Sequence, residues 1–260
     1  MKDDFEMIIK HIAGNEDVNI YPISDMHVGA KEFIEGNWKA FKKKLQSEEN
    51  SYIILNGDLM NNATRISVSN VYEDVMTPLQ QREWLIDELN DIKGKILAVT
   101  SGNHERRNRD VDNHPIYDIC RIIGIADVYR EYMAFLKLRI GNTAGNGNRN
   151  PTYMLGMNHG AGGGGTSGAV INRNEKYSYY MEGLDGLFVG HTHKGMLSYP
   201  TRLVIDKHNN KITRQECAII SCNAWLNYGD YALGAMFGPC GNRQQKLMLS
   251  GNKKYMQTLY

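Results

Sequence analysis

The sequence predicts an α/β fold whose first strands run parallel. Short apolar segments at residues 18–24, 51–56 and 95–100 alternate with amphipathic segments at residues 32–45 and 78–92. Helices between short buried strands are typical of parallel pairing, because the chain must return to the same end of the sheet before each new strand. Each strand ends in polar or turn-forming residues, and α/β sheets bind ligands beyond the carboxyl ends of their strands.

The individual elements of this half follow from hydrophobic periodicity. The segment VNIYPIS at residues 18–24 is short and β-rich, and it ends at Asp25. Residues 32–45 carry apolar side chains at helical spacing, from Phe33 to Leu45, which predicts an amphipathic helix. The runs SYIILN at 51–56 and KILAVT at 95–100 are typical of buried strands, and the segment between them, from Pro78 onward, repeats the helical pattern.

The second half of the chain is richer in β-type segments. Strands are expected at residues 132–140 and 152–158 around a polar connection, followed by a short helix at 174–182 and a strand at 186–189. Residues 196–205 and 211–221 are expected to form a hairpin that turns at 207–210. The segment 225–260 is rich in Gly, Tyr and Asn and carries no assignment. No repeat or linker is visible, so we expect one domain over residues 1–260, with a β-rich C-terminal part at 194–260.

Composition excludes several classes of protein. Thirty basic and twenty-nine acidic residues give a net charge of +1, so the chain as a whole is no polycation built for nucleic acid, although local patches remain open. A hydrophobic fraction of 42% argues against a disordered, collagen-like or coiled-coil protein. No apolar run approaches the roughly 18 to 20 residues of a membrane span, and residues 1–18 lack the apolar core of a signal peptide. The four cysteines contain no CxxC pair, so we expect reduced thiols and a cytoplasmic location.

The polar residues beyond the strand ends share the chemistry of metal ligands. They are Asp25, His27, Asp58, Asn103, His104, His159, His191 and His193. Carboxylate oxygens and neutral imidazole nitrogens together suit Mn²⁺, Fe and Zn²⁺. Even seven of these eight residues as ligands exceed what one tetrahedral metal takes, so two metals are the natural count. Each motif alone is more often a turn, a cap or a solvated pair. Their recurrence in order, each after a strand, favours metal binding.

These blocks resemble the signature of the calcineurin-like metallophosphoesterases. The similarity rests on the segments DMH from Asp25, GD before Leu59, GNHE from Gly102, NH at His159 and GHTH from Gly190, and it spans residues 25–193 with every block in order. The resemblance implies a four-layer α/β/β/α sandwich with two metals at one end.

The resemblance also implies a role for each matching position. One metal would be held by Asp25, His27, Asp58 and His193, and the other by Asp58, Asn103, His159 and His191, with Asp58 as the bridge. His104 matches the catalytic histidine of the family, which is not a ligand, and Glu105 would orient it. The cofactors would be two divalent ions, with Mn²⁺ favoured over Zn²⁺, Fe or Ni. The reaction would be in-line attack on phosphorus by a hydroxide that bridges the metals.

Several neighbouring residues are candidates for substrate binding. Arg106 and Arg107 follow His104 directly, and guanidinium groups match phosphate oxygens, although a solvated basic turn is an equal alternative. Asn61 and Arg65 follow Asp58, where a turn or cap role is equally open.

A glycine-rich stretch is the most individual feature of the sequence. Six of the nine positions from Gly160 to Gly168 are glycine, directly after His159. It is no Walker A loop, because no Gly-Lys-Ser/Thr follows. We expect Gly163 and Gly164 to belong to a lid or a backbone-amide cradle, with a flexible spacer as the alternative.

The substrate class is narrowed by the details of the motifs. The segment from Asp25 to Gly29 and the GHTH ending resemble the exonuclease-like branch, and phage or prophage phosphoesterases in particular. This implies a phosphodiesterase or nuclease acting on a nucleotide or nucleic acid in the cytoplasm of a bacterium or a phage-infected host. The alternatives are a phosphomonoesterase and a non-catalytic metal-binding module. Residues 59–62, LMNN, depart from the protein-phosphatase pattern. By analogy with nuclease relatives, residues 67–91 could supply a helix for a homodimer.

Overall fold

The computed structural model describes residues 3–64, 73–107, 113–142, 150–163, 166–234, 238–239, 241 and 243–259. Its strands form two six-stranded sheets and one separate two-stranded ribbon. The first sheet has the order β14 (Met256–Leu259), β13 (Lys246–Leu249), β2 (Val18–Ile23), β3 (Ser51–Asn56), β4 (Ile96–Thr100), β5 (Tyr129–Arg130). The second has the order β1 (Ile8–Ile12), β6 (Met133–Ile140), β7 (Thr152–Asn158), β8 (Gly186–Val189), β12 (Ala218–Ser221), β9 (Met196–Ser198).

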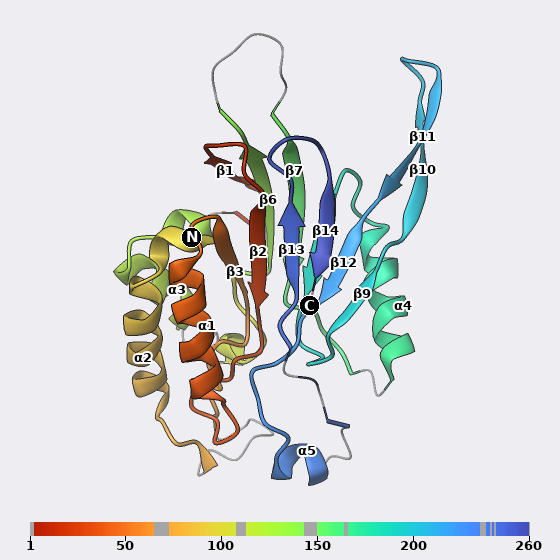
Figure 1. Ribbon diagram of the computed structural model, residues 1–260. Coiled ribbons are helices and arrows are strands. Elements are labelled where there is room, and N and C mark those ends of the chain that lie inside the picture. Colours follow the sequence, from red (N-terminus) through yellow and green to blue (C-terminus); the bar gives the residue numbers. More distant parts are fainter. Residues whose placement is uncertain are drawn as a thin grey trace.

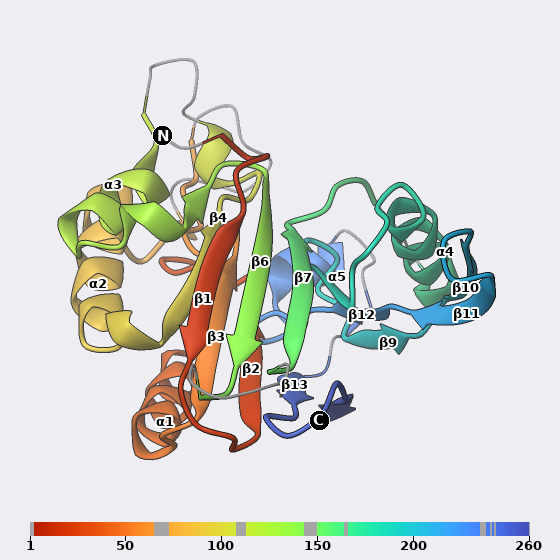
Figure 2. The same ribbon diagram turned by 90° about the horizontal axis from the view of Figure 1, so that it is seen from above.

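The two sheets lie between helices, which gives the four layers that the family resemblance implies. Helices α1 (Glu35–Ser47), α2 (Pro78–Asn90) and α3 (Pro115–Ile122) cover the outer face of the first sheet, on the left of Figure 1. Helix α4 (Ser167–Ser178) covers the second sheet on the opposite side, as Figure 2 shows from above. The short α5 (Asp230–Gly234) lies at the lower end of the molecule in Figure 1. The prediction of an α/β/β/α sandwich is confirmed.

The parallel core of the first sheet arises from strands that are buried on both faces. In β2 and β3 only the second residue is less than fully buried, and all of β4 is buried. Such continuous apolar strands suit a sheet covered by helices on one side and by a second sheet on the other. β2, β3, β4 and β5 pair in parallel, so their carboxyl ends meet at one edge, toward which the arrow of β2 points in Figure 1.

Helix α4 begins seven residues earlier than the expected 174–182, at Ser167 instead of Asn174. The Thr166 side chain accepts a hydrogen bond from the Ala169 N–H and caps the first turn. The segment before the helix is rich in glycine and the first turn is polar, so apolar periodicity does not indicate that the helix begins here. The helix still buries one stripe, at Val170, Asn174 and Ser178.

The hairpin is also shorter than predicted. Only β10 (Thr201–Asp206) and β11 (Lys211–Glu216) pair with each other, around the expected turn at residues 207–210. The outer parts of the predicted arms became β9 and β12, which pair with each other inside the second sheet. The β10–β11 ribbon projects from the body at the upper right of Figure 1.

The core is one large cluster of buried apolar side chains around both sheets, with a smaller one beneath α4. The smaller cluster contains Leu184, Leu187, Val189, Cys217 and Ile219. Across the described ranges, no helix combines the length and the apolar character needed to cross a bilayer. Residues 67–72 of the segment proposed for a dimer helix lie outside the described residues.

Candidate metal centre

Every candidate ligand lies just beyond the carboxyl end of a strand. In the first sheet, Asp25 and His27 follow β2, Asp58 follows β3, and Asn103 follows β4; in the second, His159 follows β7, and His191 and His193 follow β8. β7 and β8 are parallel, as are β2, β3 and β4, so each sheet collects its polar ends at one edge. The two edges meet, and the candidate site lies where they join.

The backbone of the site is held in an uncommon conformation. Five candidate ligands have left-handed φ angles between 49° and 71°: Asp25, His27, Asp58, His191 and His193. Elsewhere in the part of the chain that the structure describes, only Asn62 and Asn210 share this conformation among non-glycine residues. It costs on the order of 1–3 kcal/mol per residue and concentrates at functional sites, because the surrounding fold must impose it.

Asn56, which the sequence analysis did not single out, joins the two sheets beneath the site. Its side chain is fully buried, and Nδ2 donates to the carbonyl oxygen of Asn158, at the end of β7, over 3.1 Å. The Asn56 carbonyl oxygen lies 2.8 Å from Nδ1 of His159, and its Oδ1 accepts from Thr100 in β4. The contact with Nδ1 leaves Nε2 of His159 aimed at the site. An asparagine at the end of an apolar strand offers no sequence signal for such a clamp.

The ring nitrogens and carboxylate oxygens converge on two neighbouring points. Asp25, His27 and His193 form one cluster and Asp58, His159 and His191 form another, each with its ligand atoms within 4.8 Å of one another. The shortest separations are 3.1 Å between His159 Nε2 and Asp58 Oδ2, and 3.2 Å between Nε2 of His27 and Nε2 of His193. Asn103 Oδ1 lies 3.2 Å from His159 Nε2, which adds a neutral oxygen to the second cluster.

A further grouping links the two clusters. His27, Asp58 and His104 also bring their ligand atoms within 4.8 Å of one another. Asp58 therefore lies between both groups, with Oδ2 at 4.0 Å from His27 Nε2 on one side and at 3.1 Å from His159 Nε2 on the other. This is the place that a bridging carboxylate would take.

The electrostatics of the buried site favour positive charge. Burial opposes ionisation of Asp25 and Asp58, but the surrounding histidines outweigh it and lower the pKa of both carboxyl groups. Burial also lowers the pKa of His159, but Asp58 and Asp25 outweigh that effect and raise the pKa to about 10. Protonated histidine thus offsets the two buried carboxylates, and a divalent ion bound by the same donor atoms would supply that positive charge instead.

His104 is held differently from the other histidines. Its Nδ1 lies 2.7 Å from the carbonyl oxygen of Asn61, and its Nε2 lies 2.8 Å from Nη2 of Arg107 and 3.7 Å from Oδ2 of Asp58. Because Arg107 can only donate, Nε2 accepts, and Nδ1 carries the proton that is donated to Asn61. Burial, together with the charge of Arg107, lowers the pKa of His104.

Glu105 contacts the backbone of the site loops. Its carboxylate accepts hydrogen bonds from the N–H groups of Gly102 at 2.7 Å, Met60 at 2.9 Å and Asp58 at 3.0 Å. Burial and the nearby Asp58 raise its pKa to about 7, against the effect of these donors. The contact that orients His104 comes from Asn61 O, so in this geometry Glu105 positions the loop that carries Asp58.

The candidates for substrate binding differ in their position and in the groups that they contact. Arg107 reaches His104 and so lies at the site. Arg106 donates to the carbonyl oxygen of Ser101 and lies over the ring of Tyr132, 5.2 Å from its centroid. The Asn61 amide donates to Asp74 over 2.7 Å. Gly163 is exposed. Arg65 and Gly164 lie outside the described residues.

Comparison with known proteins identifies the family. The family model described as calcineurin-like phosphoesterase matches residues 18–195. The chain belongs to the calcineurin-like phosphoesterases. The matched segment runs from β2 to just beyond His193, so it contains all the candidate ligands. The family implies divalent metal ions, and the two Asp/His clusters fit a dinuclear site.

Solved structures that match this phosphoesterase are distant from it. One is a conserved uncharacterized protein, a predicted phosphoesterase, from Streptococcus pneumoniae TIGR4, with 11% identity, a TM-score of 0.33, and coverage of 94% of this chain and 97% of that one. Another is a metallophosphoesterase from Sphaerobacter thermophilus, with 12% identity, a TM-score of 0.38, and coverage of 94% and 89%. A search of curated proteins finds no match to this chain.

Proposed function

We propose that this phosphoesterase is a phosphodiesterase or nuclease that uses two divalent ions, with Mn²⁺ as the first choice. One ion would be held by Asp25, His27, Asp58 and His193, and the other by Asp58, Asn103, His159 and His191. The observation that supports the proposal most is the position of Asp58, whose carboxylate lies between both Asp/His clusters. A mixed oxygen and imidazole donor set suits Mn²⁺.

The chain's own residues would act on the substrate around these ions. When bound, the ions supply charge neutralisation at the phosphoryl group and a water nucleophile activated near neutral pH. Asn61 O accepts from the Nδ1–H of His104 and so directs Nε2 into the site. Nε2 accepts from Arg107 in this structure, so it would first take up a proton when Arg107 turns to the phosphate, and it would then pass that proton to the leaving oxygen. Arg107, whose guanidinium is 2.8 Å from Nε2, would bind a non-bridging phosphate oxygen.

Two features support a diester over a protein-phosphatase substrate. The loop after Asp58 carries Asn61 and Asn62, which are both buried, where the protein-phosphatase pattern Gly-Asp-x-x-Asp-Arg-Gly has charged residues. The exonuclease-like motif at residues 25–29 carries two candidate ligands. A phosphomonoesterase is the second candidate, and the observation that favours it is Arg107, because a guanidinium fork also suits a terminal phosphate.

The proposal is tested with the Mn²⁺-loaded protein on two small esters. We expect a higher kcat/KM for bis-p-nitrophenyl phosphate than for p-nitrophenyl phosphate. The reverse order would replace the first candidate by the second. If the protein with two bound ions hydrolyses neither ester nor an oligonucleotide, the remaining alternative is a non-catalytic metal-binding module.

The role of His104 is tested separately from metal binding. His104→Gln should keep near-normal metal content and lose about 10²- to 10⁴-fold in rate on a dinucleotide, the usual effect of a positioned acid. The loss should be smaller on bis-p-nitrophenyl phosphate, because its leaving group needs no proton. His208→Gln, in the β10–β11 turn, is the matched control. Loss of metal from His104→Gln would make His104 a ligand instead.

A further inference from the structure

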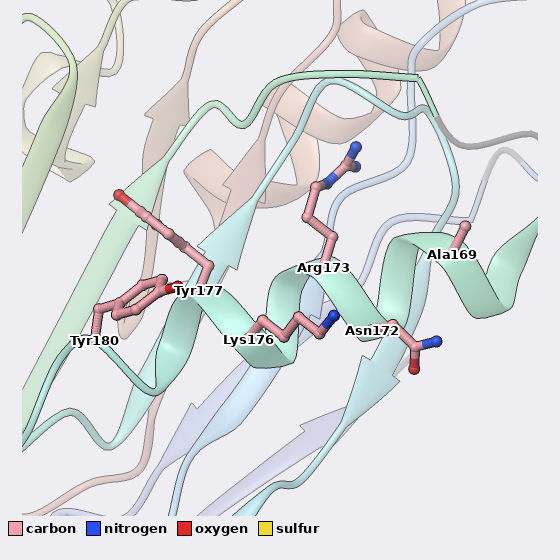
Figure 3. A pocket seen from close by; sticks show the side chains of 6 residues that line it. All are labelled: Ala169, Asn172, Arg173, Lys176, Tyr177 and Tyr180. Atoms are coloured by element: carbon pink, nitrogen blue, oxygen red, sulfur yellow. The ribbon is translucent and has the colours of Figure 1, made fainter.

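A hollow of about 410 Å³ lies along helix α4, outside the candidate metal centre. Its lining residues come from the helix and the turn after it: Ala169, Asn172, Arg173, Lys176, Tyr177 and Tyr180. Figure 3 shows Arg173 and Lys176 on neighbouring turns and the two tyrosines together at the C-terminal end.

The charge of this hollow has one sign. Arg173 and Lys176 line it, and none of the six lining residues is acidic. Nη1 of Arg173 donates to the carbonyl oxygen of Gly162 over 2.8 Å, whereas its Nη2 is buried and has no hydrogen-bond partner among the described residues. A buried guanidinium nitrogen without an acceptor is costly, and an anion that enters the hollow would supply one.

The tyrosines supply a second kind of contact. Tyr177 packs against the small cluster under α4, and its hydroxyl lies 3.6 Å from the sulfur of Met133, which anchors the ring. Tyr180, three residues later, is 83% exposed. An exposed aromatic ring beside cationic side chains is the arrangement by which proteins stack bases and hold the backbone of single-stranded nucleic acid.

A short loop connects the hollow to the metal centre. Gly162, which accepts the bond from Arg173, is three residues beyond the candidate ligand His159. Gly160, between them, has a φ of 95°, and a Cβ there would lie 3.3 Å from Gly190 O and 3.5 Å from Cβ of His191. The loop is therefore packed against a candidate ligand at one end and tied to Arg173 at the other.

We propose that the α4 hollow, lined by Arg173, Lys176, Tyr177 and Tyr180, binds the part of a single-stranded nucleic acid that extends beyond the scissile phosphodiester. The inference rests on the proposed function and specifies its substrate class. Arg173 and Lys176 contact backbone phosphates, and Tyr180 stacks on a base. Because stacking and phosphate contacts do not depend on base identity, this site should bind single strands without a preference for their sequence.

The test measures binding and turnover separately. In the His104→Gln background, a fluorescent single-stranded oligonucleotide is titrated against Lys176→Ala/Tyr180→Ala and against a matched control, Lys253→Ala/Tyr255→Ala, in the β13–β14 turn. We expect the first pair to weaken binding about tenfold or more and to reduce the salt slope by about one. The control should keep the parent affinity. With His104 restored, the first pair should lower kcat/KM on the oligonucleotide more than on bis-p-nitrophenyl phosphate.

Each failure has its own signature. If the wild-type protein hydrolyses phosphodiesters but both pairs bind the oligonucleotide alike, the hollow is overturned and the proposed function stands. If no phosphodiester is hydrolysed while the first pair still loses oligonucleotide binding, the proposed function fails and the binding site remains. Equal competition by polyglutamate of the same charge would show a plain polyanion surface and overturn the nucleic-acid assignment.

Discussion

Asp58 is the residue on which the proposed dinuclear site should depend most. Its carboxylate lies between both Asp/His clusters, so Asp58→Asn should lower occupancy at both positions rather than at one. The amide keeps the shape of the side chain but removes a charge that the surrounding histidines stabilise. We expect metal content after Mn²⁺ loading, measured by mass spectrometry, to fall well below that of the wild type. Asp87→Asn, exposed on α2, is the control. Two bound ions in Asp58→Asn would refute the bridging role.

Gly102 matters because it leaves room for Asp58. A Cβ at Gly102 would overlap the Asp58 carboxylate and its backbone nitrogen, whereas a Cβ at Gly94 would meet nothing within 4 Å. Gly102→Ala should therefore displace Asp58 and lower metal content without removing any ligand, and Gly94→Ala should leave metal content unchanged. Metal analysis of the two variants makes the comparison. Equal metal content in both would mean that the loop yields without moving the carboxylate.

The residues of the site differ in how far their roles can be predicted from the sequence. Asp58 can be predicted as a metal ligand because it follows a buried strand and belongs to a series of motifs that occur in the order of the family signature. Asn56 and the Asn61 carbonyl cannot be predicted, because their roles depend on backbone atoms that meet across two sheets. A run of three lysines at residues 42–44 predicts a solvated basic face, yet Lys42 is largely buried, with Nζ 3.0 Å from Glu88 and 2.8 Å from Asp91.

Helix α2 begins with a reciprocal capping arrangement. The Thr77 Oγ1 accepts a hydrogen bond from the Gln80 N–H at 3.3 Å, and Gln80 Oε1 accepts one from the Thr77 N–H at 2.9 Å. Thr77→Ala should lower the free energy of unfolding by about 0.5–2 kcal/mol. Because each side chain serves the other's backbone, Thr77→Ala and Gln80→Ala should be non-additive in a double-mutant cycle followed by urea denaturation. Strict additivity would show that the two bonds act independently.

Strands could be predicted from the sequence where burial produces a continuous or alternating pattern of apolar residues. The strands at 51–56, 152–158 and 186–189 have the predicted bounds, because each is a continuous or alternating apolar run between turn residues. β13 and β14 escaped assignment, since they are four residues each and lie in a polar segment. β13 joins the first sheet by antiparallel pairing with β2, and β14 pairs with β13. A local sequence pattern does not predict such long-range pairing.

At the scale of the whole molecule, three buried thiols among the described residues lie in different parts of the core. Cys120 in α3 belongs to the large cluster, Cys217 to the small cluster under α4, and Cys222 follows β12. Burial raises the pKa of all three, to about 12 for Cys120 and about 11 for Cys217. A thiol disulfide-exchange reagent needs the thiolate and access to it, so both requirements protect these residues in the folded protein.

The small cluster should open before the large one. It contains five buried apolar residues and lies at the end of the second sheet that carries the β10–β11 ribbon, whereas the large cluster joins both sheets. In a Cys240→Ser background at pH 8, we expect the native protein to resist labelling. As guanidinium is raised below the unfolding midpoint, Cys217 should react before Cys120, because small clusters open at lower free energy. Peptide mass spectrometry of samples quenched at intervals gives the order. Simultaneous labelling of the two cysteines at every guanidinium concentration would instead mean that the sheets and α4 unfold as one cooperative unit.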